Sequence, residues 1–314
     1  MAGKIAIVGA GLIGRSWAIV FARGGHEVAL YDADAGQTAR ALETIAASLA
    51  DMEEAGLIAK AEALKGLIRK AASLDEAIEG AAHVQENVAE RLDVKRQVFA
   101  EIERLAAKDA VLASSSSALM PSLIFERLAG RERCLVAHPM NPPHLAPIVE
   151  LCGAPFTAPE TVARARATFE RCEMAPIAVR REIDGFILNR LQHAVLNEAF
   201  RLIGKGYVST EDLDRTMKDG LALRWSFMGP IETIDLNAPE GIADYVARYG
   251  ETIRRVGRDI AQSGDWPDAV AAQMDGERRR AVPLDKLEAE QAWRDRRLMA
   301  LASHKRDAAK KTGK

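Results

Sequence analysis

A histidine and a carboxylate lie twelve residues apart, on the two sides of a loop that contains several prolines. His138 ends an apolar run that begins at Cys134, and Glu150 lies inside the next apolar run, residues 148–151. A histidine titrates near neutral pH and a nearby carboxylate favours its charged form, so this pair could accept a proton during catalysis. A lone histidine at a strand end is more often structural, so the prediction depends on the elements around it.

A glycine-rich motif near the N-terminus predicts a nucleotide site. Residues 4–8 read as a buried strand, and Gly9, Gly11 and Gly14 follow with the spacing G-x-G-x-x-G before an apolar helix. The first glycine permits a tight turn, the second lets the backbone approach a pyrophosphate, and the third lets the helix pack on the strand. The N-terminus of the helix offers N–H groups to the anion.

An acidic residue after the second expected strand indicates which dinucleotide binds. Residues 27–31 form this strand, and Asp32 follows it directly. A carboxylate at this position can accept hydrogen bonds from the ribose hydroxyls of the adenosine half and would repel a 2′-phosphate. We therefore expect NAD rather than NADP.

Strands and helices then alternate along the chain. A long helical region, residues 35–66, has Asp34 as its expected N-cap and should form a helix pair between the second and third strands. Expected strands at residues 83–88 and 111–113 flank a helix at 93–106. This order predicts a doubly wound, mostly parallel α/β sheet of the Rossmann type, with ligands beyond the C-terminal strand ends.

Three groups of residues lie at those strand ends: residues 86–90, the serines 114–117, and His138. Serine at a strand end commonly caps the next helix, which is the role we expect for Ser114 and Ser115. The sequence alone therefore brings one serine run and the histidine to the same sheet edge.

The pattern changes after residue 183, where helices follow one another without strands. We expect residues 1–183 to form a NAD-binding domain and residues 184–314 a second, all-helical domain. The first helix should begin at Phe186, which puts Asn189 about one turn in. Because a buried amide without a partner is costly, Asn189 should be paired structurally or face a polar ligand.

Composition excludes several classes of partner. The chain has 314 residues, a formal net charge of -2 and 48% hydrophobic residues, which is typical of a soluble globular protein without affinity for nucleic acid or an anionic membrane. Three cysteines without CxxC spacing fit a reducing, cytoplasmic compartment. We expect no metal site, no signal peptide and no membrane span.

The chain resembles the 3-hydroxyacyl-CoA dehydrogenase superfamily, most closely its lambda-crystallin branch, whose enzymatic members are L-gulonate 3-dehydrogenases. The likeness covers nearly the whole chain. Its most distinctive segments are the glycine motif, Ser114 to Pro121, Val136 to Pro143, Val149 to Leu151, and Gly185 to Gln192.

The resemblance implies a role for each residue that matches. His138 would be the catalytic base, Glu150 would orient it and stabilise its charged form, and Ser117 and Asn189 would bind the substrate oxygen at C3. The likeness also implies a homodimer, in which the helical domain provides the contact.

The cofactor contacts are likewise implied by the resemblance. Leu12, Ile13 and Asp32 would touch the adenosine half of NAD, and Glu90 and Lys95 would reach the ribose on the nicotinamide side.

One departure from the acyl-CoA members bears on the substrate. Those members typically have two aromatic residues between the histidine and the Asn-Pro, whereas Pro139 and Met140 precede Asn141 here. We therefore expect a free acid, with Asn141 among the substrate-binding residues. A free carboxylate would bind well to a guanidinium, and Arg224 is our hypothesis, in cis or from a second subunit; an exposed structural arginine is an equal alternative.

Three functions remain open on these residues. The first is a free 3-hydroxy acid dehydrogenase, with L-gulonate ahead of carnitine and short 3-hydroxy acids. The second is a 3-hydroxyacyl-CoA dehydrogenase. The third is a NAD-binding structural protein of the crystallin kind, which would have no physical need for a buried His/Glu pair.

Overall fold

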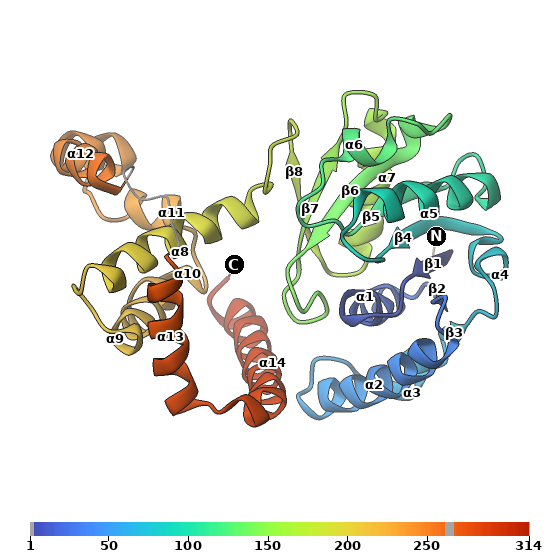
Figure 1. Ribbon diagram of the computed structural model, residues 1–314, viewed down its shortest axis with the longest axis horizontal. Coiled ribbons are helices and arrows are strands. Elements are labelled where there is room, and N and C mark those ends of the chain that lie inside the picture. Colours follow the sequence, from blue (N-terminus) through green and yellow to red (C-terminus); the bar gives the residue numbers. More distant parts are fainter. Residues whose placement is uncertain (1–2, 261–266, 314) are drawn as a thin grey trace. The chain divides into compact units, whose positions relative to one another are not determined.

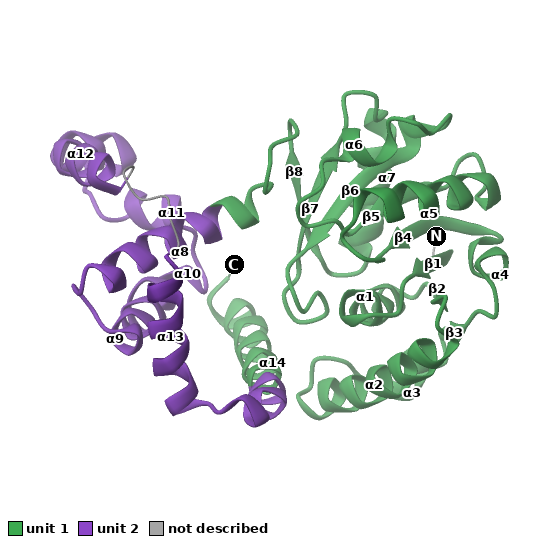
Figure 2. Cartoon of the chain, viewed as in Figure 1, with its two compact units in different colours: residues 1–190, 294–314 green, residues 191–293 purple. Residues whose placement is uncertain are grey.

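The computed structural model describes residues 3–260 and 267–313. It divides into two compact units, residues 1–190 with 294–314 and residues 191–293, which are coloured separately in Figure 2. A domain division at residue 184 stays a prediction.

An eight-stranded sheet forms the centre of the first unit (Figure 1). Its strands, in spatial order, are β3, β2, β1, β4, β5, β6, β7 and β8. All neighbouring strands pair in parallel except β6 and β7, which pair antiparallel. The bounds are β1 Lys4–Val8, β2 Glu27–Tyr31, β3 Ile68–Lys70, β4 Ala81–Glu86, β5 Val111–Ser114, β6 Cys134–Pro139, β7 Ile148–Gly153 and β8 Ala175–Val179.

Helices cover both faces of this sheet because successive strand residues point to opposite sides. In β1, Ile5 and Ile7 pack with one set of helices, while Ala6 and Val8 pack with the other. The first set is α1 (Leu12–Arg23), α2 (Ala35–Glu54), α3 (Ala61–Lys65) and α7 (Pro159–Arg171), joined by Met299 of α14 (Leu287–Thr312). The second set is α4 (Leu74–Ile78), α5 (Leu92–Leu105) and α6 (Pro121–Phe125). The predicted doubly wound α/β fold is confirmed.

The expected helix pair after the second strand is present as α2 and α3, and Asp34 caps α2 by accepting a hydrogen bond from the N–H of Gly36 at 2.8 Å. The short edge strand β3 was not expected. It has three residues, and only the first, Ile68, is buried. Its other two residues, Arg69 and Lys70, are exposed.

The second unit is all-helical in its described residues, as expected. Its elements are α8 (Leu188–Gly204, whose first turn belongs to the first unit), α9 (Thr210–Arg215), a π-helical turn (Thr216–Leu221), α10 (Ala222–Trp225), α11 (Pro230–Asp235), α12 (Gly241–Ile260), α13 (Asp268–Ala281), a 3-10 turn (Leu284–Lys286) and the start of α14, residues 287–293. Within residues 3–260 and 267–313, no helix is long and apolar enough to cross a membrane.

Candidate active site

His138 and Glu150 meet across the antiparallel pair β6–β7. They are directly opposite in the register, and the Nδ1 atom of His138 lies 2.7 Å from Oε2 of Glu150. Their side chains are 6% and 1% exposed, so the contact is shielded from water. The other carboxylate oxygen, Oε1, accepts hydrogen bonds from the backbone N–H groups of Ile187 and Leu188 at 2.8 and 2.9 Å. The predicted pair therefore exists, and the start of α8 holds it in place.

The electrostatics keep Glu150 ionised. Burial alone would raise the pKa of its carboxyl, but the hydrogen bonds from His138, Leu188 and Ile187 outweigh burial and lower that pKa. An ionised carboxylate can only accept hydrogen bonds, so Nδ1 of His138 carries a proton. In the neutral ring, Nε2 is then left as a proton acceptor, which is the state that a general base needs.

A left-handed turn places an aromatic ring against the histidine. Gly185 and Phe186 have φ angles of 74° and 48°, and the fully buried ring of Phe186 lies 5.5 Å from the ring of His138 between centroids. A residue with positive φ cannot continue a right-handed helix. The expected helix start at Phe186 is therefore wrong, and α8 begins at Leu188.

Asn189 and Ser117 also meet. Asn189 lies in the first turn of α8, and its Nδ2 donates a hydrogen bond to the backbone oxygen of Ser117 at 2.7 Å. Ser117 is exposed three residues beyond the end of β5, which runs parallel to β6. The structure thus brings the serine loop and the start of α8 together.

Ser114 and Ser115 do not cap a helix, so that expectation is wrong. The hydroxyl of Ser114 donates to Oε2 of Glu86 at 2.5 Å, and that of Ser115 donates to Oδ1 of Asn87 at 2.7 Å. Ser115 also accepts from Nε1 of Trp17 at 2.9 Å. Both serines stabilise polar groups inside the fold, and α6 begins only at Pro121.

The three motif glycines differ in the space around them: the backbone is crowded at Gly9 and Gly14 and open at Gly11. A Cβ at Gly14 would lie 1.8 Å from the oxygen of Gly9, and Gly9 itself has a φ of 96°. A Cβ at Gly11, by contrast, would meet nothing within 4 Å in the described structure. Gly11 is also the N-cap of α1, whose first turn, within the described residues, contains no acid. This open, electropositive helix end fits a pyrophosphate.

A cavity of about 420 Å³ is lined by Gly9 and Gly11 of this motif. Asp32 lines it, with Oδ2 accepting from the N–H of Ala10 at 2.8 Å and Oδ1 from the N–H of Asp34 at 2.9 Å. Leu12 and Ile13 lie in the first turn of α1, and the side chain of Leu12 is exposed. The three expected adenosine contacts therefore lie just beyond the C-terminal ends of β1 and β2. Their roles stay predictions.

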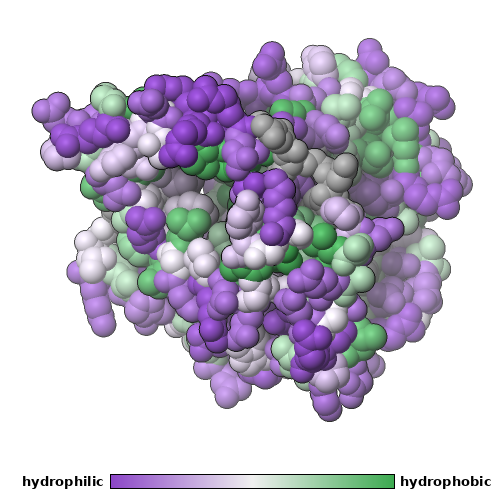
Figure 3. Space-filling model, turned by 60° about the vertical axis from the view of Figure 1, so that its left-hand side comes forward, coloured by the Kyte–Doolittle hydropathy of each residue, from purple (hydrophilic) through white to green (hydrophobic). Residues whose placement is uncertain are grey.

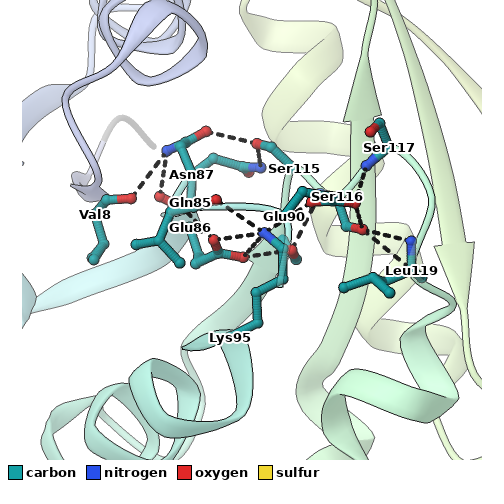
Figure 4. A network of polar contacts seen from close by, with 12 residues as sticks. Val8, Gln85, Glu86, Asn87, Glu90, Lys95, Ser115, Ser116, Ser117 and Leu119 are labelled. Atoms are coloured by element: carbon teal, nitrogen blue, oxygen red, sulfur yellow. Dashed lines mark hydrogen bonds and ion pairs between the residues drawn. The ribbon is translucent and has the colours of Figure 1, made fainter. Parts of the chain in front are cut away.

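A charged cluster forms between the end of β4 and the serine loop (Figure 4). The ammonium of Lys95 lies 2.8 Å from Oε1 of Glu86 and 3.3 Å from Oε2 of Glu90. Burial raises the pKa of the Glu86 carboxyl, against the opposing effect of Lys95. For Glu90, burial is outweighed by bonds from Ser116 and by Lys95, which lower its pKa. Lys95 is 1% exposed, so its charge is satisfied within the protein.

The two expected substrate-binding residues are less constrained. Asn141 is exposed in the loop between β6 and β7, and Arg224 is exposed on α10 of the second unit. Their roles stay predictions. Glu86 is the residue that sequence reasoning left without a role, although a carboxylate within an expected strand is a recognisable signal, because acidic side chains are rarely buried unless they are paired. Among the described residues, no three His, Cys, Asp or Glu side chains are placed to hold a metal.

The fold defines a protein with a Rossmann-type nucleotide-binding sheet followed by helices. Comparison with known families refines this class: residues 4–183 match the NAD binding domain of 3-hydroxyacyl-CoA dehydrogenase, and residues 185–273 match its C-terminal domain. The chain belongs to the 3-hydroxyacyl-CoA dehydrogenase family, a family of NAD-dependent oxidoreductases that act on CH–OH groups.

Individual relatives align with most of this chain. Lambda-crystallin of Oryctolagus cuniculus is 44% identical over 310 residues, 97% of each chain. L-carnitine dehydrogenase of Oceanobacillus iheyensis is 34% identical and covers 80% of this chain and 81% of its own. Among solved structures, 5-formyl-3-hydroxy-2-methylpyridine 4-carboxylic acid 5-dehydrogenase, an NAD+ dependent dismutase, superposes with a TM-score of 0.84 at 27% identity, over 96% of this chain and 98% of that one.

Proposed function

We propose that this protein oxidises the C3 hydroxyl group of a free 3-hydroxy acid with NAD as the oxidant, and that L-gulonate is the leading substrate. The observation that carries the proposal is the buried His138–Glu150 pair, which keeps a protonated Nδ1 and an accepting Nε2 at the sheet edge. When NAD is bound, its nicotinamide supplies the hydride acceptor.

Each residue of the site has a task in this reaction. Nε2 of His138 takes the proton of the C3 hydroxyl, and Glu150 stabilises the imidazolium that forms. The hydroxyl of Ser117 and the amide of Asn189 hold the substrate oxygen, so that the proton and the hydride leave along aligned paths. General-base assistance of this kind contributes about 10²- to 10⁴-fold in rate.

The proposed NAD site uses the glycine cradle and two sets of flanking residues. Gly9, Gly11 and Gly14 admit the pyrophosphate at the N-terminus of α1. The flanking residues are Leu12, Ile13 and Asp32 on the adenosine half, and Glu90 and Lys95 on the side of the nicotinamide ribose. Lys95 would act there through Glu90, because its own side chain is buried.

Two observations support a free acid over a CoA thioester. The relative named L-carnitine dehydrogenase and the solved pyridine carboxylic acid dehydrogenase have, by their names, small carboxylic acids as substrates. This chain also has Pro139 and Met140 before Asn141. Asn141 and Arg224 are the proposed contacts of the substrate, with Arg224 binding its carboxylate. Arg224→Lys should raise the KM for the acid and leave that for NAD unchanged; an unchanged KM for the acid would exclude Arg224.

We also propose a cytoplasmic homodimer. Five apolar side chains form a stripe along α12, and each is between 40% and 48% exposed. A contiguous exposed apolar surface of this kind is typical of a protein–protein contact. The five residues are Ile242, Val246, Tyr249, Ile253 and Val256. Apolar residues reach the surface on the face shown in Figure 3 as well. The three buried, free cysteines fit a reducing compartment. Light scattering that gives the mass of one chain would contradict the dimer.

The family supports one alternative, oxidation of a 3-hydroxyacyl-CoA. Titration with acetoacetyl-CoA and NADH tests it, because rapid NADH consumption would favour the thioester. The lambda-crystallin relatives support another, a NAD-binding structural protein with little turnover. A protein that binds NADH but turns over none of these substrates would favour that alternative.

A further inference from the structure

Glu86 lies at the end of β4 with no exposed surface, although nothing in the proposed chemistry uses it directly. Its carboxylate is fully engaged. Oε1 accepts from the ammonium of Lys95 at 2.8 Å and from the N–H of Val88 at 2.6 Å, while Oε2 accepts from the hydroxyl of Ser114 at 2.5 Å and again from Lys95 at 3.0 Å. Such a group fixes the position of Lys95.

Lys95 connects Glu86 to a second carboxylate. Its ammonium also lies 3.3 Å from Oε2 of Glu90, which is 36% exposed. An ammonium has three protons, and these contacts use them inside the protein. Lys95 therefore fixes Oε2 of Glu90 from the buried side, and the other oxygen, Oε1, contacts the serine loop.

Glu90 in turn holds the serine loop. Its Oε1 accepts from the backbone N–H groups of Ser117 and Ala118 at 2.9 and 3.0 Å, and from the hydroxyl of Ser116. The backbone oxygen of Ser117 accepts from Asn189. Figure 4 shows this succession of contacts as far as Ser117. Both groups proposed to bind the C3 oxygen thus depend on where Glu90 lies.

We infer that Glu86 is a positioning residue, which acts through Lys95 and Glu90 to hold the loop that presents Ser117 to the substrate. This inference rests on the proposed function for its consequence in turnover, but not for the loop contacts themselves. Without the charge of Glu86, the ammonium is drawn to Glu90 alone, and the Glu90 carboxylate moves away from the two loop amides.

Glu86→Gln tests the inference. Hydrogen exchange at the Ser117 and Ala118 amides should accelerate by at least about tenfold, and kcat should fall by about tenfold or more, because small misplacements of a reacting group are costly. Affinity for ADP should fall less than kcat, because Glu86 contacts the lining of the adenosine cavity through the N–H of Val88, whereas both loop amides depend on Glu90. Unchanged exchange at both amides would overturn the inference.

The double variant Glu86→Gln with Lys95→Met separates positioning from charge balance. Removing both charges restores thermal stability relative to Glu86→Gln, since no ammonium stays buried after losing one of its two carboxylate partners. Exchange should nevertheless remain fast and kcat low, because Glu90 has lost its anchor. Recovery of slow exchange and of kcat together with stability would show that Glu86 only balances charge.

Glu103→Gln is the matched control. Glu103 lies on α5, the helix of Lys95, and its carboxylate, like that of Glu90, holds a loop by accepting from two backbone N–H groups, those of Ala129 and Gly130. This variant should lose stability without a change in kcat or in exchange at Ser117.

Should Glu86→Gln fail to fold, Glu86→Asp replaces it in the test. This variant keeps the charge, but its shorter side chain should accelerate hydrogen exchange at the Ser117 and Ala118 amides. A wild-type protein that oxidises no 3-hydroxy acid would refute the proposed function, while the exchange data would still decide the role of Glu86.

Discussion

His138 and Glu150 face each other across the antiparallel strand pair of an otherwise parallel sheet, with Nδ1 and Oε2 separated by 2.7 Å. In an antiparallel pair, directly opposite residues project to the same face with Cβ atoms about 5 Å apart. A parallel neighbour would need a crossover of a dozen or more residues to reach that position. The change of strand direction is therefore what lets one short loop deliver both members of the pair.

Glu150 should make the free energy of unfolding depend on pH. Its folded-state pKa lies below the ordinary value of 4.5, so the ionised form contributes stability that is complete above 4.5 and is lost as the pH falls through the folded value. Glu150→Gln lacks this contribution at every pH. Urea unfolding of both proteins should show a difference in unfolding free energy that narrows below that value. A difference independent of pH would mean that Glu150 is not held ionised by the fold.

His138→Gln should lower kcat by at least about 100-fold, because the variant has no proton acceptor at Nε2. Binding of NAD should remain nearly intact, since the glycine cradle lies between β1 and α1, away from β6. Steady-state kinetics with the best substrate and calorimetric titration with NAD give the two values. Full turnover in the variant would remove the histidine from the mechanism.

Two glycine substitutions should separate folding from cofactor binding. Gly14→Ala places a Cβ 1.8 Å from the oxygen of Gly9, so thermal unfolding should show a loss of about 1–3 kcal/mol or more. Gly11→Ala meets nothing within 4 Å in the described structure, so it should fold normally but weaken NAD by occupying the space of the pyrophosphate. Equal NAD affinity in Gly11→Ala and wild type would contradict the proposed cradle.

Asp32→Asn should relax the preference for NAD. The carboxylate lines the cavity beside the glycines, where it would repel a 2′-phosphate. Removing the charge while keeping the shape should raise kcat/KM for NADP relative to NAD by about tenfold, since like-charge contacts cost several kcal/mol at most. The ratio of the two kcat/KM values measures this, and an unchanged ratio would place Asp32 away from the ribose.

Elements with strong periodicity were predictable from the sequence. The strands at residues 4–8 and 27–31 and the helix pair after Asp34 are present as expected, because each combines an apolar pattern with a local signal. The short strand β3 could not be predicted, because three residues are too few to show an apolar periodicity. Its pairing with β2 is what defines it as a strand.

The site shows the same limit. His138 and Glu150 could be paired from the apolar runs that contain them, but the roles of Ser114 and Ser115 could not, because their partners Glu86 and Asn87 come from a different strand end. The start of α8 was misplaced because the left-handed φ of Phe186 follows from packing against His138 and not from any local preference.

The most direct test of the proposed function is NADH formation by the wild-type protein with L-gulonate, L-carnitine and 3-hydroxybutyrate, each compared with 3-hydroxybutyryl-CoA under the same conditions. A free 3-hydroxy acid should give the highest kcat/KM, with L-gulonate foremost. NADH formation from the thioester alone would contradict the free-acid assignment, and none from any substrate would contradict the dehydrogenase itself.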